Sequence, residues 1–502
     1  MENSVKIMLM QLVFTRLFAL ERRQIAFMAG EKSPVRISHL LFAVSCSEME
    51  IIMANNSKEM DMLNGNLSGK LILFALPLAF SSILQQLFNS ADVAVVGRFA
   101  NSNALPAVGS CVAIVGIFVT LIVGLSVGPN AALANLIGQN KREKIHDMVH
   151  TIITFGLVLG LVLMVIGMIT AKTILIASGT PREILNDAML YIEIYFISIP
   201  FMVIYNFGSA ILRSVGDTRR PMYYLLISGV VNVALNLLLV IVFHLGVSGV
   251  AIGTVVSNII SAFLVMRYLC TRQTEFKFIF KDMEINKEHL GKILAIGIPA
   301  GIQGALFSIS NIFIQSGINS FGSDAIAGSS LALNFEYFTY DISSAFAQAA
   351  VTFISQNYGA GNVKRCNKIF GLCLLYGFTF TEILSVIFLI WDGFFVSIYT
   401  ISPTVAAYGL IRLHHVGALE GLTATYEVGS SALRGMGKSL EPAIITVLGT
   451  VVFRLIWLYT IFNAHKTFDM LMNVYVVSWI FTGTLIFIVY ARFMKKHLAK
   501  NA

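Results

Sequence analysis

The sequence predicts an all-α, polytopic membrane protein with about 12 transmembrane helices in two pseudo-symmetric six-helix lobes. The first indication is composition: of 502 residues, 56% are hydrophobic and 12% are charged, and the mean hydropathy is +0.78. Soluble domains carry roughly twice that charged fraction. The second is a series of apolar runs, most of them long enough to cross a bilayer. The third is a pattern of Gly, Arg and Pro that occurs in both halves.

Hydropathy places the first predicted span at Leu71–Phe99, a segment that also contains Pro77, Gln85, Gln86, Asn89 and Asp92. The approximate limits of all the predicted spans are 71–97, 104–128, 148–170, 187–212, 221–243, 247–270, 291–317, 325–353, 368–391, 403–433, 441–463 and 470–491. The corresponding organisation is an N-terminal extension (1–63), a first lobe (64–270), an inter-lobe linker (271–288), a second lobe (289–492) and a tail (493–502).

Residues 1–59 differ from the rest of the chain, because their apolar pieces are too short to span a membrane. They also lack the small-residue cleavage site of a secretory signal. One interpretation is that natural translation starts near Met53, Met60 or Met62, and the alternative is an interfacial or disordered arm. We expect that deletion of residues 1–59 leaves membrane insertion and transport intact.

The loops differ in charge from one side of the predicted membrane to the other. One side carries clusters such as Lys141–Lys144, Arg213–Arg220 and Lys364–Lys368, whereas the other has only scattered basic residues. The positive-inside rule therefore predicts that both termini are cytoplasmic. The expected location is the inner or plasma membrane. The same charge distribution argues against a nucleic-acid partner.

An internal repeat relates the two halves. The segment GSAILRSVGDTRRP begins at Gly208, and GSSALRGMGKSLEP begins at Gly429, an offset of 221 residues. Pro77 in the first span corresponds to Pro299 in the seventh at an offset of 222. Six spans return the chain to the same side, so the repeat is parallel and its axis lies along the membrane normal. Transporters whose lobes rock about a central cavity have this symmetry.

Together these motifs resemble the multidrug and toxic-compound extrusion (MATE) family over about Asn64–Arg492. The residues that carry the resemblance are PLAFSSILQQLFNSADVAVVGRF, the GQN turn after the second span and LRSVGDTRRP. The resemblance implies two lobes around a V-shaped cavity. It also implies a secondary active multidrug antiporter that exports amphipathic, often cationic compounds in exchange for H+ or Na+ by alternating access.

In the family, an acidic residue late in the first span is a coupling-ion site, and Asp92 matches it. Asn232 and Thr254 match two further family positions, whereas Asn236 stands where some members carry Asp. Asn232 and Asn236 are four residues apart and share a helix face. A carboxylate in an apolar cavity resists ionisation, so Asp92 is the candidate for H+ exchange, or for Na+ binding with Asn232 and Thr254. The alternative for the three polar neighbours is helix–helix hydrogen bonding.

Other intramembrane polar residues are candidates for the substrate cavity: Gln85, Asn89, Gln303, Asn311, Glu336, Glu420 and Glu427. Glu420 and Glu427 are seven residues apart, which predicts a common helix face. Acidic cavity walls would attract cationic compounds. The alternative is internal charge pairing, with Arg412 or Arg454 neutralising a carboxylate.

No feature of the sequence indicates catalysis, because it contains neither a phosphate-binding GxxxxGK[ST] motif nor HExxH or GxSxG. Its five scattered cysteines predict neither disulfides nor a zinc site. We expect no enzyme activity and no cofactor beyond the coupling ion. The expected partners are small organic substrates and membrane lipids, and the expected state is a monomer. The alternatives are a flippase for lipid-linked oligosaccharides from the same superfamily and, less favoured, a membrane-embedded enzyme.

Overall fold

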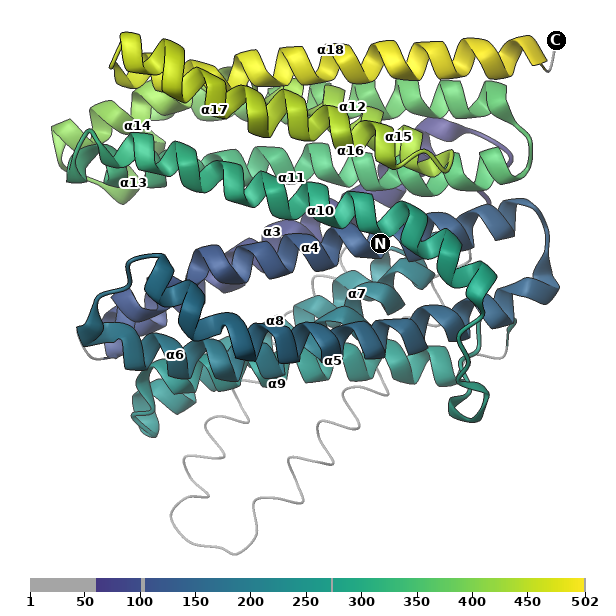
Figure 1. The fold of residues 1–502 in the computed structure, drawn as a ribbon, viewed down its shortest axis with the longest axis horizontal. Helices are drawn as coiled ribbons and strands as arrows, with labels where there is room; N and C mark the ends of the chain where they lie inside the picture. The colour runs from purple at the N-terminus through teal and green to yellow at the C-terminus, as the bar shows by residue number, and fades with distance from the viewer. Residues whose placement is uncertain (1–59, 101–103, 272–273, 501–502) are drawn as a thin grey trace, which may run out of the picture. The chain divides into compact units, whose positions relative to one another are not determined.

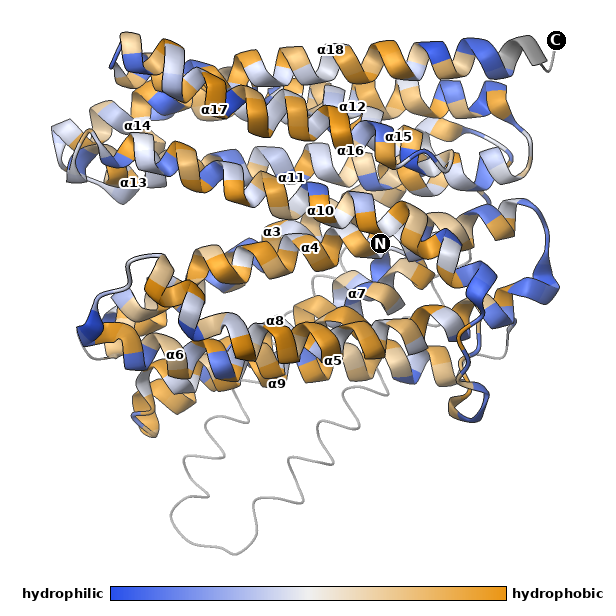
Figure 2. Cartoon of the chain, viewed as in Figure 1, coloured by the Kyte–Doolittle hydropathy of each residue, from blue (hydrophilic) through white to orange (hydrophobic). Residues whose placement is uncertain are grey.

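The described part of the chain is helical, as the sequence predicts. The computed structural model describes residues 60–100, 104–271 and 274–500, and these ranges contain no β-strand. The two interpretations of residues 1–59 concern a segment outside these ranges. Hydrophobic residues dominate the central parts of the helices, while hydrophilic residues gather at the loops and helix ends (Figure 2).

The first half of the described chain consists of long helices joined by short turns. Asn66 starts its first helix by accepting a hydrogen bond from the Ser68 N–H at 3.1 Å, which satisfies one of the free donors of the first turn. The helices are α3 (Leu67–Phe99), α4 (Ala104–Gly138), η1 (Arg142–Lys144), α5 (Ile145–Ala177), α6 (Arg182–Ile197), α7 (Ile199–Ser214), α8 (Arg219–Leu237), the π-helical η2 (Leu238–Val242) and α9 (Gly246–Thr271).

The second half repeats this arrangement. Asn286 caps its first long helix by accepting from the Glu288 and His289 N–H groups. The elements are η3 (Phe280–Asp282), α10 (Lys287–Asn319), α11 (Ser323–Gly359), α12 (Val363–Ile390), α13 (Asp392–Tyr399), α14 (Pro403–His415), η4 (Gly417–Leu422), α15 (Thr423–Gly435), α16 (Leu440–Thr446), η5 (Val447–Val452), α17 (Phe453–Trp457), η6 (Leu458–Phe462) and α18 (Phe468–Lys500).

Within the described residues, apolar helices account for nine, or up to ten, of the twelve predicted crossings. Nine helical segments are long and apolar enough to span a bilayer, and the pair α6–α7, bent by 41°, makes a tenth if its two helices are one span. The remaining two predicted spans correspond to α11 and to the series α14–η4–α15. The first carries Asp324, Glu336 and Asp341, and the second is interrupted.

Four of the predicted spans are less regular than the hydropathy pattern indicates. Span 187–212 bends between α6 and α7, where Pro200 in the first turn of α7 lacks an N–H donor. Span 403–433 is broken at η4, where Leu419 has φ −131°. Span 221–243 contains the π-helical η2 near its end, and span 441–463 contains the π-helical segments η5 and η6. These interruptions arise from backbone geometry, which an average over side-chain hydropathy does not detect.

Two hydrophobic cores correspond broadly to the two halves of the chain. One contains residues from α4 to α9, and the other contains residues from α10 to α18. The first half of α3 is an exception, because Leu67, Leu71, Phe74 and Leu78 belong to the second core. Phe74 packs edge-on against Phe353 of α11, with 5.3 Å between ring centroids. The helix α3 therefore joins the two halves.

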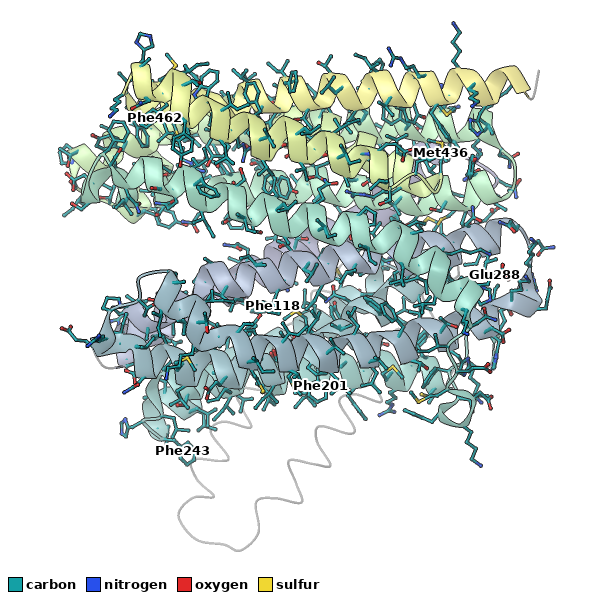
Figure 3. The ribbon with its side chains drawn as sticks, in the orientation of Figure 1. Phe118, Phe201, Phe243, Glu288, Met436 and Phe462 are labelled. Atoms are coloured by element: carbon teal, nitrogen blue, oxygen red, sulfur yellow. The ribbon has the colours of Figure 1, made fainter. Side chains whose placement is uncertain are left out.

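The two halves pack closely near one end of the helices. We call it the linker end, because the linker residues 274–286 and the α4–α5 and α15–α16 turns lie there; it is on the right in Figure 1. Figure 3 marks it by Glu288 and Met436, whereas Phe243 and Phe462 lie at the opposite end.

Glycines allow the backbones to approach at the linker end. A Cβ on Gly128 of α4 would lie 2.3 Å from the Ile293 carbonyl oxygen of α10, and one on Gly138 would lie 1.9 Å from the Gln356 carbonyl oxygen of α11. Asn130 donates to the Thr352 hydroxyl across the same contact at 2.9 Å.

Toward the opposite end, the same helix faces become exposed. On α3, the buried positions Leu71, Phe74 and Leu78 are followed on one face by the exposed Gln85 and Asn89. The face of α3 that packs on the other half near the linker end is thus polar and accessible farther along the helix. We infer that the halves part toward this end, as the ribbons of α4 and α10 also indicate (Figure 1).

Candidate functional site

Asp92 of α3 meets Asn232 and Asn236 of α8, and we call these three residues the Asp92 cluster. The Asn236 amide Nδ2 donates to Asp92 Oδ1 at 2.5 Å and is 3.4 Å from Asn232 Oδ1. Asn236 and Asn232 are buried, while Asp92 is half-buried. The spacing of four residues places both amides on the face of α8 that meets α3. The structure therefore brings together three of the four residues proposed for cation coupling.

Close packing brings α3 onto α8. The Phe88 ring lies against Gly229, where a Cβ would come within 1.9 Å of the ring. Phe88 precedes Asp92 by one helical turn, so this contact fixes the position along α8 at which Asp92 meets that helix. A side chain larger than hydrogen at position 229 would force the Phe88 ring to move.

Asn236 has one polar atom without a partner. Its Oδ1 is buried and makes no hydrogen bond within the described residues. The oxygen points at Gly253 of α9, because a Cβ built there would lie 2.0 Å from it. Buried polar atoms usually have a partner, so the amide oxygen is available for a proton donor or a cation beside Asp92.

Thr254, the fourth proposed residue, follows Gly253 on α9. Its hydroxyl donates to the Val250 carbonyl within its own helix at 3.1 Å. This intrahelical bond leaves oxygen lone pairs on the hydroxyl, but the structure shows no bond from Thr254 to Asp92, Asn232 or Asn236.

Two tyrosines of α6 belong to the same neighbourhood. Tyr191 and Tyr195 are buried, their rings stack with centroids 6.2 Å apart, and both interact electrostatically with Asp92. The sequence alone did not single them out. The available signal was two tyrosines four residues apart in an apolar segment, a pattern that is equally typical of a packed core.

The candidate substrate residues of the second half are largely engaged in internal contacts. Glu336 of α11 forms a bidentate pair with Arg412 of α14, with Nε–Oε1 and Nη2–Oε2 distances of 2.6 and 2.7 Å. Both side chains are buried. This is the internal charge pairing that the sequence left open as an alternative.

The amide candidates also contact arginines. Gln303 Oε1 accepts from Arg434 Nη2 at 2.6 Å, and Asn311 Oδ1 accepts from Arg454 Nη1 at 3.1 Å. Arg454 also lies over the Tyr475 ring, 4.6 Å from its centroid. Such contacts stabilise a buried guanidinium.

The two candidate glutamates of the tenth span do not share a regular helix face. Glu420 lies in η4, and Glu427 lies in α15 beyond the interruption. Glu427 accepts from the Tyr340 hydroxyl at 2.9 Å. Glu420 is buried, and its Oε2 has no hydrogen-bond partner among the described residues. The remaining two candidates, Gln85 and Asn89, lie exposed on α3.

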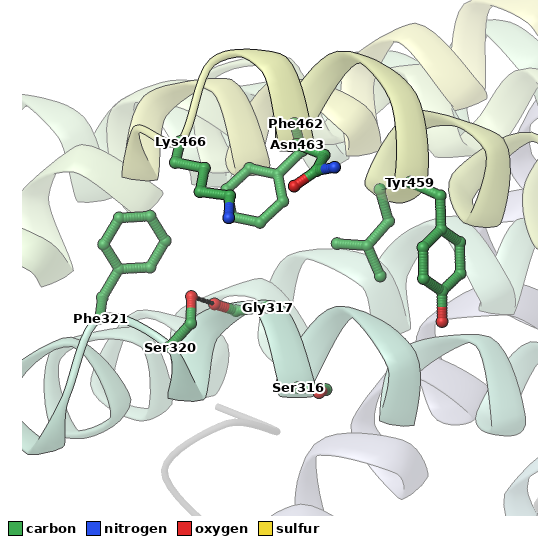
Figure 4. Close-up of a pocket in the computed structure, with 9 residues that line it drawn as sticks. Ser316, Gly317, Ser320, Phe321, Tyr459, Phe462, Asn463 and Lys466 are labelled. Carbon is green, nitrogen blue, oxygen red and sulfur yellow. Dashed lines mark hydrogen bonds between the residues drawn. The ribbon is translucent and has the colours of Figure 1, made fainter.

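A pocket of about 570 Å³ lies elsewhere, between the ends of α10 and η6 (Figure 4). Ser316, Ser320, Tyr459, Phe462 and Lys466 are among its lining residues. None of the residues proposed from the sequence lines it. Its single cationic side chain, Lys466, gives it a character different from that of the Asp92 cluster.

A group of His146, His150 and Asp282 has the ligand types of a metal site. However, His150 Nε2 accepts the Ile279 N–H at 3.0 Å, so its Nδ1, 2.8 Å from the His146 carbonyl oxygen, carries the proton. Neither ring nitrogen then offers a lone pair to a metal. His150 instead anchors the linker to α5.

The comparisons with known proteins agree with this architecture. The MatE family model matches residues 77–238 and again residues 299–460, which together are more than half of the chain. The chain belongs to the MatE family. The two matches are separated by the same 222 residues that relate Pro77 to Pro299, so the repeat recognised in the sequence is the MatE repeat.

Among curated relatives, the chain is similar to the probable multidrug resistance protein YoeA of Bacillus subtilis. The two are 27% identical over 384 residues, covering 75% of this chain and 82% of YoeA. It is also 24% identical over 391 residues to the probable multidrug resistance protein NorM of Thermotoga maritima, covering 77% and 84% of the two chains. MatE members are transporters, not enzymes.

Solved structures show the same fold. A crystal structure of MATE in complex with MaL6 superposes with a TM-score of 0.82 at 20% identity, covering 88% of this chain and 100% of the other. An outward-facing MATE family transporter gives 0.80 at 21% identity, covering 88% and 99%. The 12-helix, two-lobe fold of this family is thus the fold of this chain.

Proposed function

We propose that this MatE protein is a secondary active antiporter, which exports amphipathic or cationic organic compounds in exchange for H+ or Na+ by alternating access. The names of its relatives support multidrug efflux as the broad activity. The two-lobe architecture supports alternating access, because the lobes pack at the linker end and part toward the other end.

The observation that carries the proposal is the Asp92 cluster. Asp92 is the only carboxylate hydrogen-bonded to the amides of α8 in the described residues. The ionised carboxylate accepts the N–H of Asn236. After protonation, the carboxyl O–H needs an acceptor, and a rotation of the Asn236 amide would present the unpartnered Oδ1 to it in place of the N–H. The cluster can therefore bind either protonation state.

The same oxygens allow Na+ as an alternative coupling ion. Carboxylate, amide and hydroxyl oxygens are ligands for hard cations, and Asp92, Asn232 and Thr254 provide one of each. The amide at position 236 leaves one carboxylate in the cluster, which offers Na+ less negative charge than two would. We therefore favour H+.

We further propose that the linker end faces the cytoplasm of a cell whose inner or plasma membrane holds the protein. The turns at this end carry basic groups such as Lys141–Lys144 and Arg434–Lys438. The positive-inside rule then places both termini in the cytoplasm. In this orientation, the structure corresponds to a state that is open to the outside and sealed toward the cytoplasm.

The test is transport by the purified protein in liposomes, with pH and Na+ gradients imposed separately. Wild-type protein should drive uphill movement of an organic cation with one of the two gradients. Asp92→Asn keeps the side-chain shape but removes titration, and should bind substrate yet fail to move it uphill.

Asp469→Asn is the matched control, because Asp469 is a half-exposed carboxylate at the start of α18, away from the cluster. Undiminished uphill transport by Asp92→Asn would remove Asp92 from the mechanism. If neither gradient drives transport by the wild type, antiport itself is wrong.

A further inference from the structure

A polar stripe runs along one face of α11. Its members follow one another at intervals of three or four residues, so they lie on the same side of the helix. We call the following set the α11 stripe: Ser330, Asn334, Tyr337, Asp341, Ser344 and Gln348. All six are exposed or half-buried, whereas Phe335, Glu336 and Thr339 between them are buried.

The α11 stripe faces the first half of the protein. Four residues beyond Gln348, the same helix face carries Thr352, which is hydrogen-bonded to Asn130 of α4. Farther along, Gly359 packs against the Asn135 backbone. The stripe is thus the continuation of the inter-lobe contact into the region where the lobes have parted. An exposed row of polar groups within a membrane helix is costly in lipid but suits a water-filled space.

Asp341 is the only ionisable carboxylate in the stripe and is not neutralised. It is half-buried, and it makes no hydrogen bond or ion pair with the described residues. Glu336, five residues earlier on the same helix, faces the lobe core instead and is paired with Arg412. Asp341 lies about 11 residues, or roughly 16 Å along the helix, from the seal at Thr352.

An aromatic ring accompanies the charge. Tyr337 is one turn from Asp341 on the stripe, and it is 42% exposed, so its ring is accessible. Tyr337 interacts electrostatically with the Arg412–Glu336 pair and, more weakly, with Asp341. A carboxylate beside an accessible aromatic face is suited to an organic cation, because the ring quadrupole and the negative charge attract the same group.

We propose that Asp341 and Tyr337 bind the cationic group of the transported compound, at the base of the space between the lobes. The inference rests on the proposed function, because it assumes that organic cations are substrates. It assigns charge recognition to α11 and separates it from the exchange of the coupling ion at Asp92. The substrate class is a monovalent aromatic cation, whose flat rings can pack on Tyr337.

The experiment measures binding of ethidium, an aromatic cation, and of Nile red, an uncharged dye, to the purified full-length protein by fluorescence anisotropy. Asp341→Asn should weaken ethidium binding about tenfold, equivalent to about 1.4 kcal/mol, and should leave Nile red binding unchanged. Asp341→Glu should restore ethidium affinity. Asp324→Asn is the matched control, since Asp324 is an exposed carboxylate on the same helix that bonds Thr404.

A pair of tyrosine variants tests the ring. Tyr337→Phe should retain ethidium affinity, and Tyr337→Ala should lose it. In a separate measurement, ethidium should slow modification of Ser344→Cys by a water-soluble thiol reagent, because Ser344 lies one turn from Asp341 on the α11 stripe and its replacement keeps both Asp341 and Tyr337. This measurement remains available if Asp341→Asn does not fold.

Three outcomes would overturn the inference. They are unchanged ethidium affinity in Asp341→Asn, equal loss of ethidium and Nile red binding, and no protection of Ser344→Cys by ethidium. Failure of the wild type to bind or transport any organic cation would instead overturn the proposed function.

Discussion

Gly128→Ala should loosen the contact between the lobes at the linker end. A Cβ at this position would lie 2.3 Å from the Ile293 carbonyl oxygen, 3.0 Å from Gly297 N and 3.1 Å from Gly297 Cα. All three atoms are backbone, so no change of side-chain rotamer relieves the clash. Ordinary contact begins at 3.4 Å, so α4 and α10 must separate by about 1 Å.

The magnitude follows from the cost of overpacking, which is about 1–3 kcal/mol. If the sealed linker end alternates with an open one, the substitution shifts that equilibrium by about 5- to 150-fold toward the open state. Gly116→Ala is the matched control, because it lies in the same helix and has nothing within 4 Å of its Cβ. Both variants gain the same helix propensity, about 1 kcal/mol.

The assay uses a cysteine in place of Ser355, which is fully buried at the inter-lobe contact. Its backbone carbonyl accepts from Asn135 Nδ2. The rate at which a water-soluble thiol reagent modifies this cysteine reports opening of the linker end. Gly128→Ala should raise the rate, and Gly116→Ala should not. Equal rates in the two variants would refute the reasoning.

Two further predictions concern buried contacts. Arg412→Met leaves Glu336 buried without its partner and should reduce the free energy of unfolding by about 3–5 kcal/mol. The double variant with Glu336→Leu should recover much of that loss. Equal thermal midpoints for the single and double variants would contradict the pairing. Gly253→Ala places a Cβ 2.0 Å from Asn236 Oδ1 and should displace the Asn236 amide from Asp92, so gradient-driven transport should fall while the amount of inserted protein stays the same. Full transport by this variant would show that the Asp92–Asn236 bond is dispensable.

The Asp92 cluster shows how far sequence reasoning reached at the site. Asp92 was recognisable because a carboxylate late in an apolar span is rare, and Asn232 and Asn236 because a spacing of four places them on one face. That the Asn236 amide meets Asp92 is a fact of how α3 packs on α8 through Phe88 and Gly229. Tyr191 and Tyr195 gave no sequence signal that distinguishes them from core residues.

The second lobe shows where sequence reasoning stopped. Glu336 and Asp341 are both acidic residues of one predicted span, and hydropathy treats them alike. The structure separates them, because five residues place them on different sides of the helix: Glu336 meets Arg412 in the lobe core, and Asp341 lies on the face toward the other lobe. The break at Leu419, which separates Glu420 from Glu427, was equally invisible.

The class of the protein, the order of its spans, the repeat and the candidate coupling carboxylate could all be read from the chain without coordinates. They follow from properties that are local or periodic along the sequence: apolar length, charge in loops, and spacing on a helix face. Only the three-dimensional packing decided which polar groups are neutralised, which half of α3 packs with the second lobe, and where the lobes part. Those features depend on contacts between residues more than a hundred positions apart, such as Asn130 and Thr352, and a helix does not encode in its own sequence which neighbour will cover each of its faces.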